Sequence, residues 1–415
     1  MAKWKRRKAR FTTPKPSRKA VALGIGTALL AWGAASNAAV NLFHFKAPQI
    51  ALSLDSSDPV ALVRDAQTRF NIGEIEGGSI EMLGIVQRSV SELPLNGPAF
   101  RLYGLTSAAN ADLPGVRAQM AMSDQLERRD AAAQLWLIED AVEQNDIARA
   151  LRHYDTALRV QRSSRALLYP VLTDALESEV IRERFLPYFD ARPPWLDSFL
   201  RYAVSNTQQP TVIAELARSA GGFPEGPAFS SLDRELLTQL VAFEEYAAAT
   251  DHFSRIDGAD PSVLGDLSLT DASTNAAFAP ITWQPFQIDG IETFVLASPS
   301  GNDAVEIEAE VEAGYKGPLA RKLLALDPGA YRLSAEMRAD DYGRADTARW
   351  IIRCAGQPQT LPLVQEEAPL ADDFTISAAF TVPQDCPVQT VFVYSDTLVS
   401  TGYISIVLAS ALISQ

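Results

Sequence analysis

The spacing of apolar residues changes once along this chain, and the change limits the fold to two kinds of domain. From about Pro59 to Ile256 apolar residues recur at helical spacing, as in "DPVALVRDAQTRF" and "RELLTQLVAFEEYAAATDHF", which predicts amphipathic helices. Later the period is two, as in "VEIEAEVE" and "YRLSAEMR", which is typical of strands with one buried face. We predict an α-helical domain at 59–257, a linker at 258–280 and an all-β antiparallel sandwich of eight or more strands at 281–415.

An uncharged segment near the N-terminus is long enough to cross a membrane. Ala20 to Phe43 is a run of 24 residues without a charged side chain, and a helix of that length spans about 36 Å, more than a hydrocarbon core of about 30 Å. Nine Lys and Arg residues precede the run, and the first acidic residue is Asp55. By the positive-inside rule we expect a basic cytoplasmic tail at 1–19, a transmembrane helix at 20–43 and a linker at 44–58.

A cleaved signal peptide is the alternative for this segment. Ser36 and Ala38 are small residues at the two positions that a signal peptidase recognises before Ala39. A long basic region with two prolines, and an apolar run longer than the roughly 7–15 residues of a signal core, favour a retained anchor. We therefore expect a bacterial inner-membrane protein of one span, with its C-terminal bulk in the periplasm.

The chain beyond the apolar segment is acidic. The sequence has 37 Lys and Arg residues, nine of them before Ala20, against 51 Asp and Glu residues, so the remainder carries a net charge of about −23. Such a body repels nucleic acid, and no nucleic-acid partner is expected. Ordinary acidic solubility would produce the same charge.

Two cysteines, Cys354 and Cys386, each stand at the edge of a strand-like stretch. In an oxidising compartment we expect a disulfide between them, worth about 3 to 4 kcal/mol on the loop-entropy view. Two buried free thiols are the alternative.

Small and aromatic residues recur at related positions in the helical region. Ala150, Tyr154 and Ala157 lie in "NDIARALRHYDTAL", and Ala249 and Phe253 follow 99 positions after Ala150 and Tyr154, which is three times 33. This spacing resembles the second helix of tetratricopeptide repeats, where a small residue admits the neighbouring helix and an aromatic ring fills the gap. The resemblance implies a solenoid-like domain that docks protein partners. A non-repetitive helical bundle is the alternative.

The sandwich region contains a series of strand motifs in a fixed order. "LLALDPGAYRLSAEMRADD" is followed by "ARWIIRCAGQ" and then by "FTVPQDCPVQTVFVYSD". From Ile281 to the end, this order resembles the jelly-roll sandwiches of non-catalytic carbohydrate-binding modules. The resemblance implies a glycan ligand, with no turnover and no cofactor.

Sugar binding requires exposed aromatic rings and polar side chains that hold hydroxyl groups. The ring of Tyr342, in the loop "ADDYGRAD", is the best candidate for exposure. Trp350 alternates with Ile352 and Cys354, so a core position is the alternative for Trp350. The candidate ligand-binding residues are Tyr342, Trp350, Arg332, Glu336 and Arg338. Other available side chains are Trp283, Tyr394, Tyr403 and Arg353.

The sequence contains no pattern that specifies a reaction. His44, His153 and His252 share no metal-ligand spacing, so neither a zinc site nor a histidine-activated nucleophile is expected. The carboxylates at 306, 308, 310 and 312 lie on one strand face without a basic neighbour in register, and we expect them to be solvated, with calcium binding as the alternative. No catalytic residue, metal or cofactor is predicted.

These features together predict a binding or scaffold protein anchored in the inner membrane of a Gram-negative bacterium. Its role would be in assembling or exporting a cell-surface polysaccharide, with a glycan bound by the sandwich and protein partners by the helices. A periplasmic glycan hydrolase that uses carboxylates, and a scaffold that binds only proteins, are the alternatives.

Overall fold

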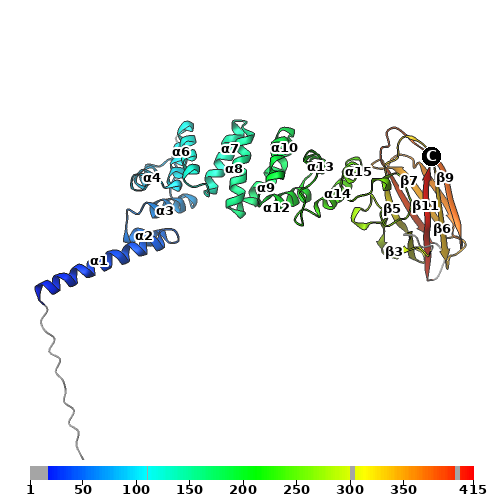
Figure 1. The fold of residues 1–415 in the computed structure, drawn as a ribbon, viewed down its shortest axis with the longest axis horizontal. Helices are drawn as coiled ribbons and strands as arrows, with labels where there is room; N and C mark the ends of the chain where they lie inside the picture. The colour runs from blue at the N-terminus through cyan, green and yellow to red at the C-terminus, as the bar shows by residue number, and fades with distance from the viewer. Residues whose placement is uncertain (1–16, 110, 300–303, 398–401) are drawn as a thin grey trace, which may run out of the picture. The chain divides into compact units, whose positions relative to one another are not determined.

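The computed structural model describes residues 17–109, 111–299, 304–397 and 402–415. Most of the basic tail predicted at 1–19 lies outside these ranges. Two compact units make up the chain, Met1–Ser164 and Arg165–Gln415. As predicted, an apolar N-terminal helix precedes a series of helices and a terminal antiparallel β-sandwich (Figure 1).

The first unit is helical. Its elements are α1 (Arg18–Phe43), α2 (Pro48–Leu54), α3 (Pro59–Asn71), α4 (Ile80–Glu92), α5 (Gly97–Ala109), α6 (Leu113–Leu126), α7 (Ala131–Glu143), α8 (Ile147–Val160) and the short 3-10 helix η1 (Arg162–Ser164).

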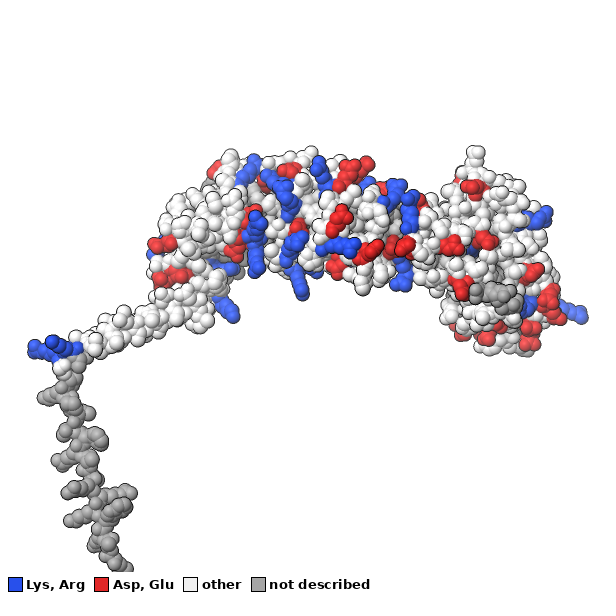
Figure 2. Space-filling model, viewed as in Figure 1, with Lys and Arg blue, Asp and Glu red and all other residues white. Residues whose placement is uncertain are grey.

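Helix α1 is long and apolar enough to cross a membrane, over Val21–Phe43, with a mean hydropathy of 1.3. A signal sequence near an N-terminus has the same properties. Large apolar side chains along α1 are exposed, among them Leu30 and Trp32, and Figure 2 shows α1 as an uncharged rod with cations at its start. Its last turn is different, because Val40 is buried in a small core with Ala51 of α2 and Ala61 of α3. The end of α1 is therefore part of the folded helical unit.

Two hairpins in this unit have the same turn. Between α5 and α6 the residue Ala111 has φ 57°, and between α7 and α8 Asn145, 34 positions later, has φ 56°. Each is followed by an aspartate, Asp112 or Asp146, whose side chain accepts a hydrogen bond from a backbone N–H of the next helix and so caps it. The equal turns show helix pairing, while their assignment to tetratricopeptide repeats remains a prediction.

Ion pairs join neighbouring helices in the first unit. The carboxylate of Asp140 on α7 is 2.7 Å from the guanidinium of Arg117 on α6 and 2.7 Å from that of Arg149 on α8. The Asp140 side chain is only 4% exposed, so pairing compensates a charge that burial would otherwise penalise.

The second unit begins with further helices. They are α9 (Arg165–Ala175), α10 (Glu179–Phe185), α11 (Pro187–Ala191), α12 (Leu196–Asn206), α13 (Pro210–Ser219), α14 (Leu232–Ala242) and α15 (Tyr246–Phe253). Aromatic rings of Tyr169, Phe185, Trp195 and Phe199 form much of their core, and the hydroxyl of Tyr169 donates to the backbone carbonyl of Trp195 at 3.1 Å.

The sandwich has two antiparallel sheets. Its strands are β1 (Gln284–Pro285), β2 (Gln287–Ile288), β3 (Ile291–Ala297), β4 (Val305–Glu312), β5 (Lys316–Leu324), β6 (Gly329–Asp340), β7 (Thr347–Cys354), β8 (Val364–Pro369), β9 (Phe374–Val382), β10 (Gln389–Asp396) and β11 (Tyr403–Ser414). One sheet has the order β1-β5-β10-β7-β8 and the other β2-β3-β4-β11-β6-β9. Both sheets bring together strands that are distant in the sequence.

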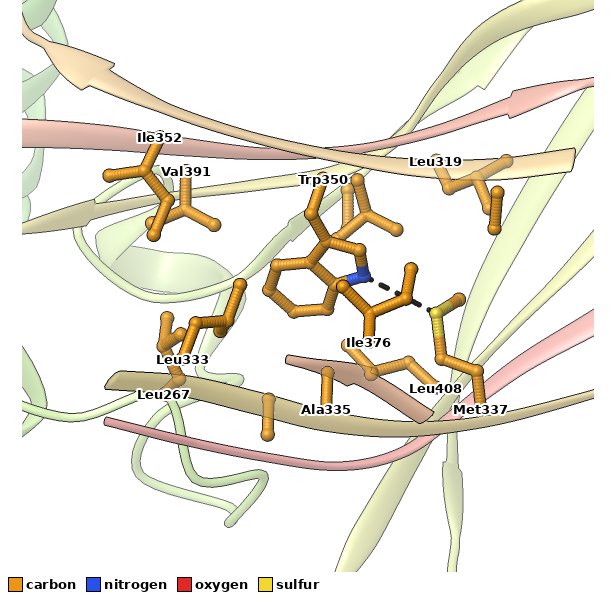
Figure 3. Packing of buried hydrophobic residues seen from close by; sticks show 14 of the residues in the cluster. Leu267, Leu319, Leu333, Ala335, Met337, Trp350, Ile352, Ile376, Val391 and Leu408 are labelled. Carbon is orange, nitrogen blue, oxygen red and sulfur yellow. Dashed lines mark hydrogen bonds between the residues drawn. The ribbon is translucent and has the colours of Figure 1, made fainter. Parts of the chain in front are cut away.

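Alternation along the strands puts one face of each sheet into a shared core (Figure 3). Leu333, Ala335 and Met337 of β6 point inward, as predicted from their spacing. Trp350 of β7 lies among them, with its indole N–H directed at the Met337 sulfur at 3.3 Å.

The segment predicted as a linker at 258–280 packs against the sandwich. It contains the short 3-10 helices η2 (Pro261–Leu264) and η3 (Ala276–Phe278). Leu267 and Leu269 belong to the sandwich core, and the backbone N–H of Ala325 donates to the carbonyl of Leu264 at 2.8 Å.

The predicted disulfide is present. Cys354, at the end of β7, is bonded to Cys386, in the turn between β9 and β10, and the two Cα atoms are 5.3 Å apart.

Candidate functional site

The outward face of the six-stranded sheet carries three of the predicted ligand-binding residues. Because side chains alternate along β6, Arg332, Glu336 and Arg338 face away from the core that Leu333 and Met337 enter. These three residues therefore share one polar surface, and their role in ligand binding stays a prediction.

A hollow of about 390 Å³ opens on this surface around Glu336 and Arg338. Neighbouring β9 contributes Phe374 and Thr375, which lie opposite Met337 and Glu336 in the strand register. Asp373, Met337 and Ala409 complete the lining.

The hollow lies at an irregularity in β11. The β6–β11 register shifts between Leu408 and Ser410, so Ala409 has no partner on β6. An extra residue of this kind is a β-bulge, which bends the strand and locally redirects side chains. Ala409 lines the hollow as a result, and the Ser410 hydroxyl donates to the Glu336 carboxylate at 3.1 Å.

Arg338 is held in place by Glu306. The Arg338 guanidinium reaches across β11 to this glutamate of β4, and one of its two hydrogen bonds measures 3.3 Å. The hydrogen bond from Arg338 is the main reason that the pKa of Glu306 is lowered, and burial partly opposes it. The same bond raises the pKa of Arg338. Both groups therefore stay charged at neutral pH.

This pairing corrects one expectation about the glutamate row. Glu306 has a basic partner, although none is in register on an adjacent strand, because Arg338 is long enough to cross one strand. Glu310 and Glu312 are exposed, as predicted. No group of His, Cys, Asp or Glu residues that could hold a metal ion is found in the described ranges.

The remaining predicted residues do not line the hollow. Trp350 is 0% exposed, so its ring cannot stack on a ligand and its ligand-binding assignment is corrected to a core role. The Tyr342 ring packs against the sandwich core, and its hydroxyl donates to Asp372 at 2.9 Å, which raises the pKa of Tyr342. Arg332 is exposed, but it lies four residues before Glu336, about 13 Å along the strand.

Sequence reasoning missed the residues that β9 and β11 contribute. Phe374 and Thr375 belong to β9, and the register that sets them beside β6 has no signal in the sequence. The same holds for Ala409, since "YISIVLASALI" gives no sign of a bulge.

Comparison with known proteins gives a limited result. No family model matches the sequence. No curated protein matches it either.

Among solved structures, several sugar-binding proteins fit the sandwich. A family-4 carbohydrate-binding module aligns with 38% of this chain and 100% of its own, at 12% identity and a TM-score of 0.24. A family-22 xylan-binding domain from Paenibacillus barcinonensis aligns with 36% and 92%, at 11% identity and a TM-score of 0.24. An arabinose-bound family-51 α-L-arabinofuranosidase aligns with 36% of this chain but 26% of its own, at 15% identity and a TM-score of 0.26. Sequence identities and TM-scores this low do not support a conclusion about function.

Proposed function

We propose that this protein is a membrane-anchored, periplasmic scaffold whose sandwich binds a glycan. The observation that supports it most is the hollow at Glu336 and Arg338, where these two charged side chains and exposed Thr375 lie on the outward face of the sheet. Polar side chains of this kind can hold the hydroxyl groups of a polyhydroxylated ligand.

The charge pair in the hollow suits a binding site. Arg338 is already oriented by Glu306, so little conformational freedom is lost when it donates to a sugar hydroxyl. Glu336 lies nearby as an acceptor, and its contact with Ser410 sets its position.

Retention of α1 as the membrane anchor is supported by the packing of its last turn. The helix runs without interruption through Ser36–Ala39, and Val40, directly after that point, is buried. The side-chain amide of Asn41 donates to the backbone carbonyl of Asn37 at 2.9 Å across the same point. A peptidase would have to unwind this packed helix end to cleave there.

The proposed orientation and compartment are supported by charge and cysteine chemistry. Cations before α1 and acidic residues after it favour a cytoplasmic N-terminus, and a Cys354–Cys386 disulfide suits an oxidising periplasm. The helical hairpins would dock protein partners in tetratricopeptide fashion, which makes a role in polysaccharide assembly or export our proposal for the whole chain.

A hydrolase is the second candidate, since Glu336 and Asp373 both line the hollow. Glycoside hydrolysis uses two carboxyl groups, one of them kept as an acid by a water-poor setting. Both residues are exposed, so that setting is missing, and we propose binding without turnover.

Glycan binding can be tested with the full chain in detergent micelles on a glycan array, followed by calorimetry with the glycans retained. Glu336→Gln should weaken binding about tenfold or more, because a hydrogen bond from a sugar hydroxyl to a charged group contributes about 1.5–3 kcal/mol. Glu310→Gln is the matched control, on the same face but outside the hollow, and should bind as the native chain does.

An array that stays blank with correctly folded protein would refute glycan binding. Release of reducing ends that is lost in both Glu336→Gln and Asp373→Asn would instead establish the hydrolase.

A further inference from the structure

The outward face of the five-stranded sheet has a different composition, in which arginines alternate with aromatic rings. The β5–β10 register places Arg321 beside Phe392, and the β10–β7 register places Tyr394 beside Arg349. The Phe392 and Tyr394 ring centroids are 5.6 Å apart, and the Arg349 guanidinium lies 5.4 Å from the Tyr394 centroid. This face combines positive charge and flat apolar surface on a strongly acidic protein.

A cavity of about 190 Å³ lies at one end of this face, where helix α15 approaches the sheet within the second unit. It is lined by Tyr246, Phe392, Arg321, Arg353 and Thr390, among other residues. The loop 355–358 forms another wall, and an added Cβ at Gly356 would be 3.8 Å from the Tyr246 ring. A cavity of this size has room for one sugar unit.

The two guanidinium groups in the cavity lack carboxylate partners. Arg321 donates through Nε to the side-chain carbonyl of Gln284 at 2.6 Å, and its guanidinium lies 5.8 Å from the Phe286 ring centroid. The Nε atom of Arg353 is buried and has no hydrogen-bond partner. Within the described part of the chain, neither residue forms an ion pair, and Glu244 is the single acidic residue that lines the cavity.

An uncompensated charge at a half-buried position is costly, and an anion would remove the cost. Burial lowers the pKa of Arg321, because desolvation disfavours its charged form. Arg353 is also half-buried. A ligand carboxylate would supply the missing partner for both groups, and the planar guanidinium fork matches a carboxylate with two parallel hydrogen bonds.

We propose that this cavity binds a uronic acid unit of an acidic glycan, with its carboxylate on Arg321 and Arg353 and its sugar ring against Tyr246 and Phe392. The aromatic rings favour a sugar over a simple anion, since they offer stacking surface for C–H groups. The site lies on the other sheet from the hollow at Glu336, so it goes beyond the proposed function and does not depend on it.

The test is calorimetry of the full chain in detergent micelles with oligogalacturonate and with the same oligomer after chemical reduction of its carboxyl groups. We expect oligogalacturonate to bind and the reduced oligomer to bind at least tenfold more weakly. Arg353→Gln should weaken oligogalacturonate binding at least tenfold. The matched control Arg344→Gln, at an exposed loop position, should bind as the native chain does.

The variant Arg353→Lys distinguishes a lost contact from a folding defect, because it keeps the positive charge but loses the planar guanidinium fork. Its affinity for oligogalacturonate should lie between that of Arg353→Gln and that of the native chain. Equal binding of both oligomers, no binding of oligogalacturonate, or full binding by Arg353→Gln would each overturn the proposal. An acidic peptide that competes as well as oligogalacturonate would overturn the sugar assignment.

The proposals for the two sites can be refuted separately. A chain that binds no glycan through Glu336 but binds oligogalacturonate through Arg353 would refute the hollow alone. The reverse pattern would refute this cavity alone.

Discussion

Lys322 has an ionisable side chain but lies in the core of the sandwich. Its side chain is fully buried, and its ammonium donates one hydrogen bond, to the backbone carbonyl of Ile281 at 3.1 Å. Burial lowers the pKa of Lys322 from 10.5 to about 7, with a small opposing effect from Asp266. Between pH 7 and 10.5 the unfolded chain binds this proton and the folded chain largely does not, so stability rises with pH in that window.

The pH dependence of stability should therefore change in Lys322→Met. For the native chain, we expect the free energy of unfolding to gain about 2 kcal/mol from this residue between pH 7 and pH 9, and we expect the variant to lack that gain. Urea unfolding followed by tryptophan fluorescence at several pH values measures the slope. Lys316→Met is the control, since Lys316 is on the same strand but exposed, and it should keep the native slope. Equal slopes in the native chain and Lys322→Met would contradict the assignment.

Among the structural elements, β7 and the loop after it connect the disulfide to the proposed uronate cavity. Cys354 ends β7 and lines the cavity, and the next residues, 355–358, form a cavity wall. The bond to Cys386, 32 positions later, ties this wall to the turn before β10. The disulfide should therefore support both the stability of the sandwich and the shape of the cavity.

Replacing both cysteines, as Cys354→Ala with Cys386→Ala, should lower the free energy of unfolding by about 3 to 4 kcal/mol. It should also weaken oligogalacturonate binding, because the loop wall is freed. Urea unfolding and calorimetry test the two effects, and reduction of the native chain should reproduce them. A loss of stability below about 0.5 kcal/mol would show that the bond constrains little.

For the whole molecule, the distribution of charge and apolar surface along the chain is the dominant feature. Cations come first, then an uncharged helix with exposed apolar side chains, then acidic folded units. The end of α1 is buried against α2 and α3 through Val40, Ala51 and Ala61. Because its last turn belongs to this core, we expect α1 to stay on the mature chain.

Mass spectrometry of the membrane fraction should accordingly find peptides from before Ala39 on the mature chain, and alkaline carbonate should fail to extract the protein. A reporter that works only in the periplasm should be active when fused after Gln415, because the proposed orientation leaves the basic N-terminus in the cytoplasm. A mature chain that begins at Ala39 would contradict the retained anchor, and a C-terminal reporter active only in the cytosol would contradict the orientation.

Which elements form, and which of their faces are buried, can be predicted from the sequence because the period of apolar residues is a local property. The strands β4 and β6 and the inward position of Leu333 followed from alternation alone. Which outward-facing residues contact one another depends on how the strands pair in the folded chain. Thr375 lies beside Glu336, Arg321 lies beside Phe392 and Arg338 pairs with Glu306 because of strand order and register. These depend on contacts between residues far apart in the chain.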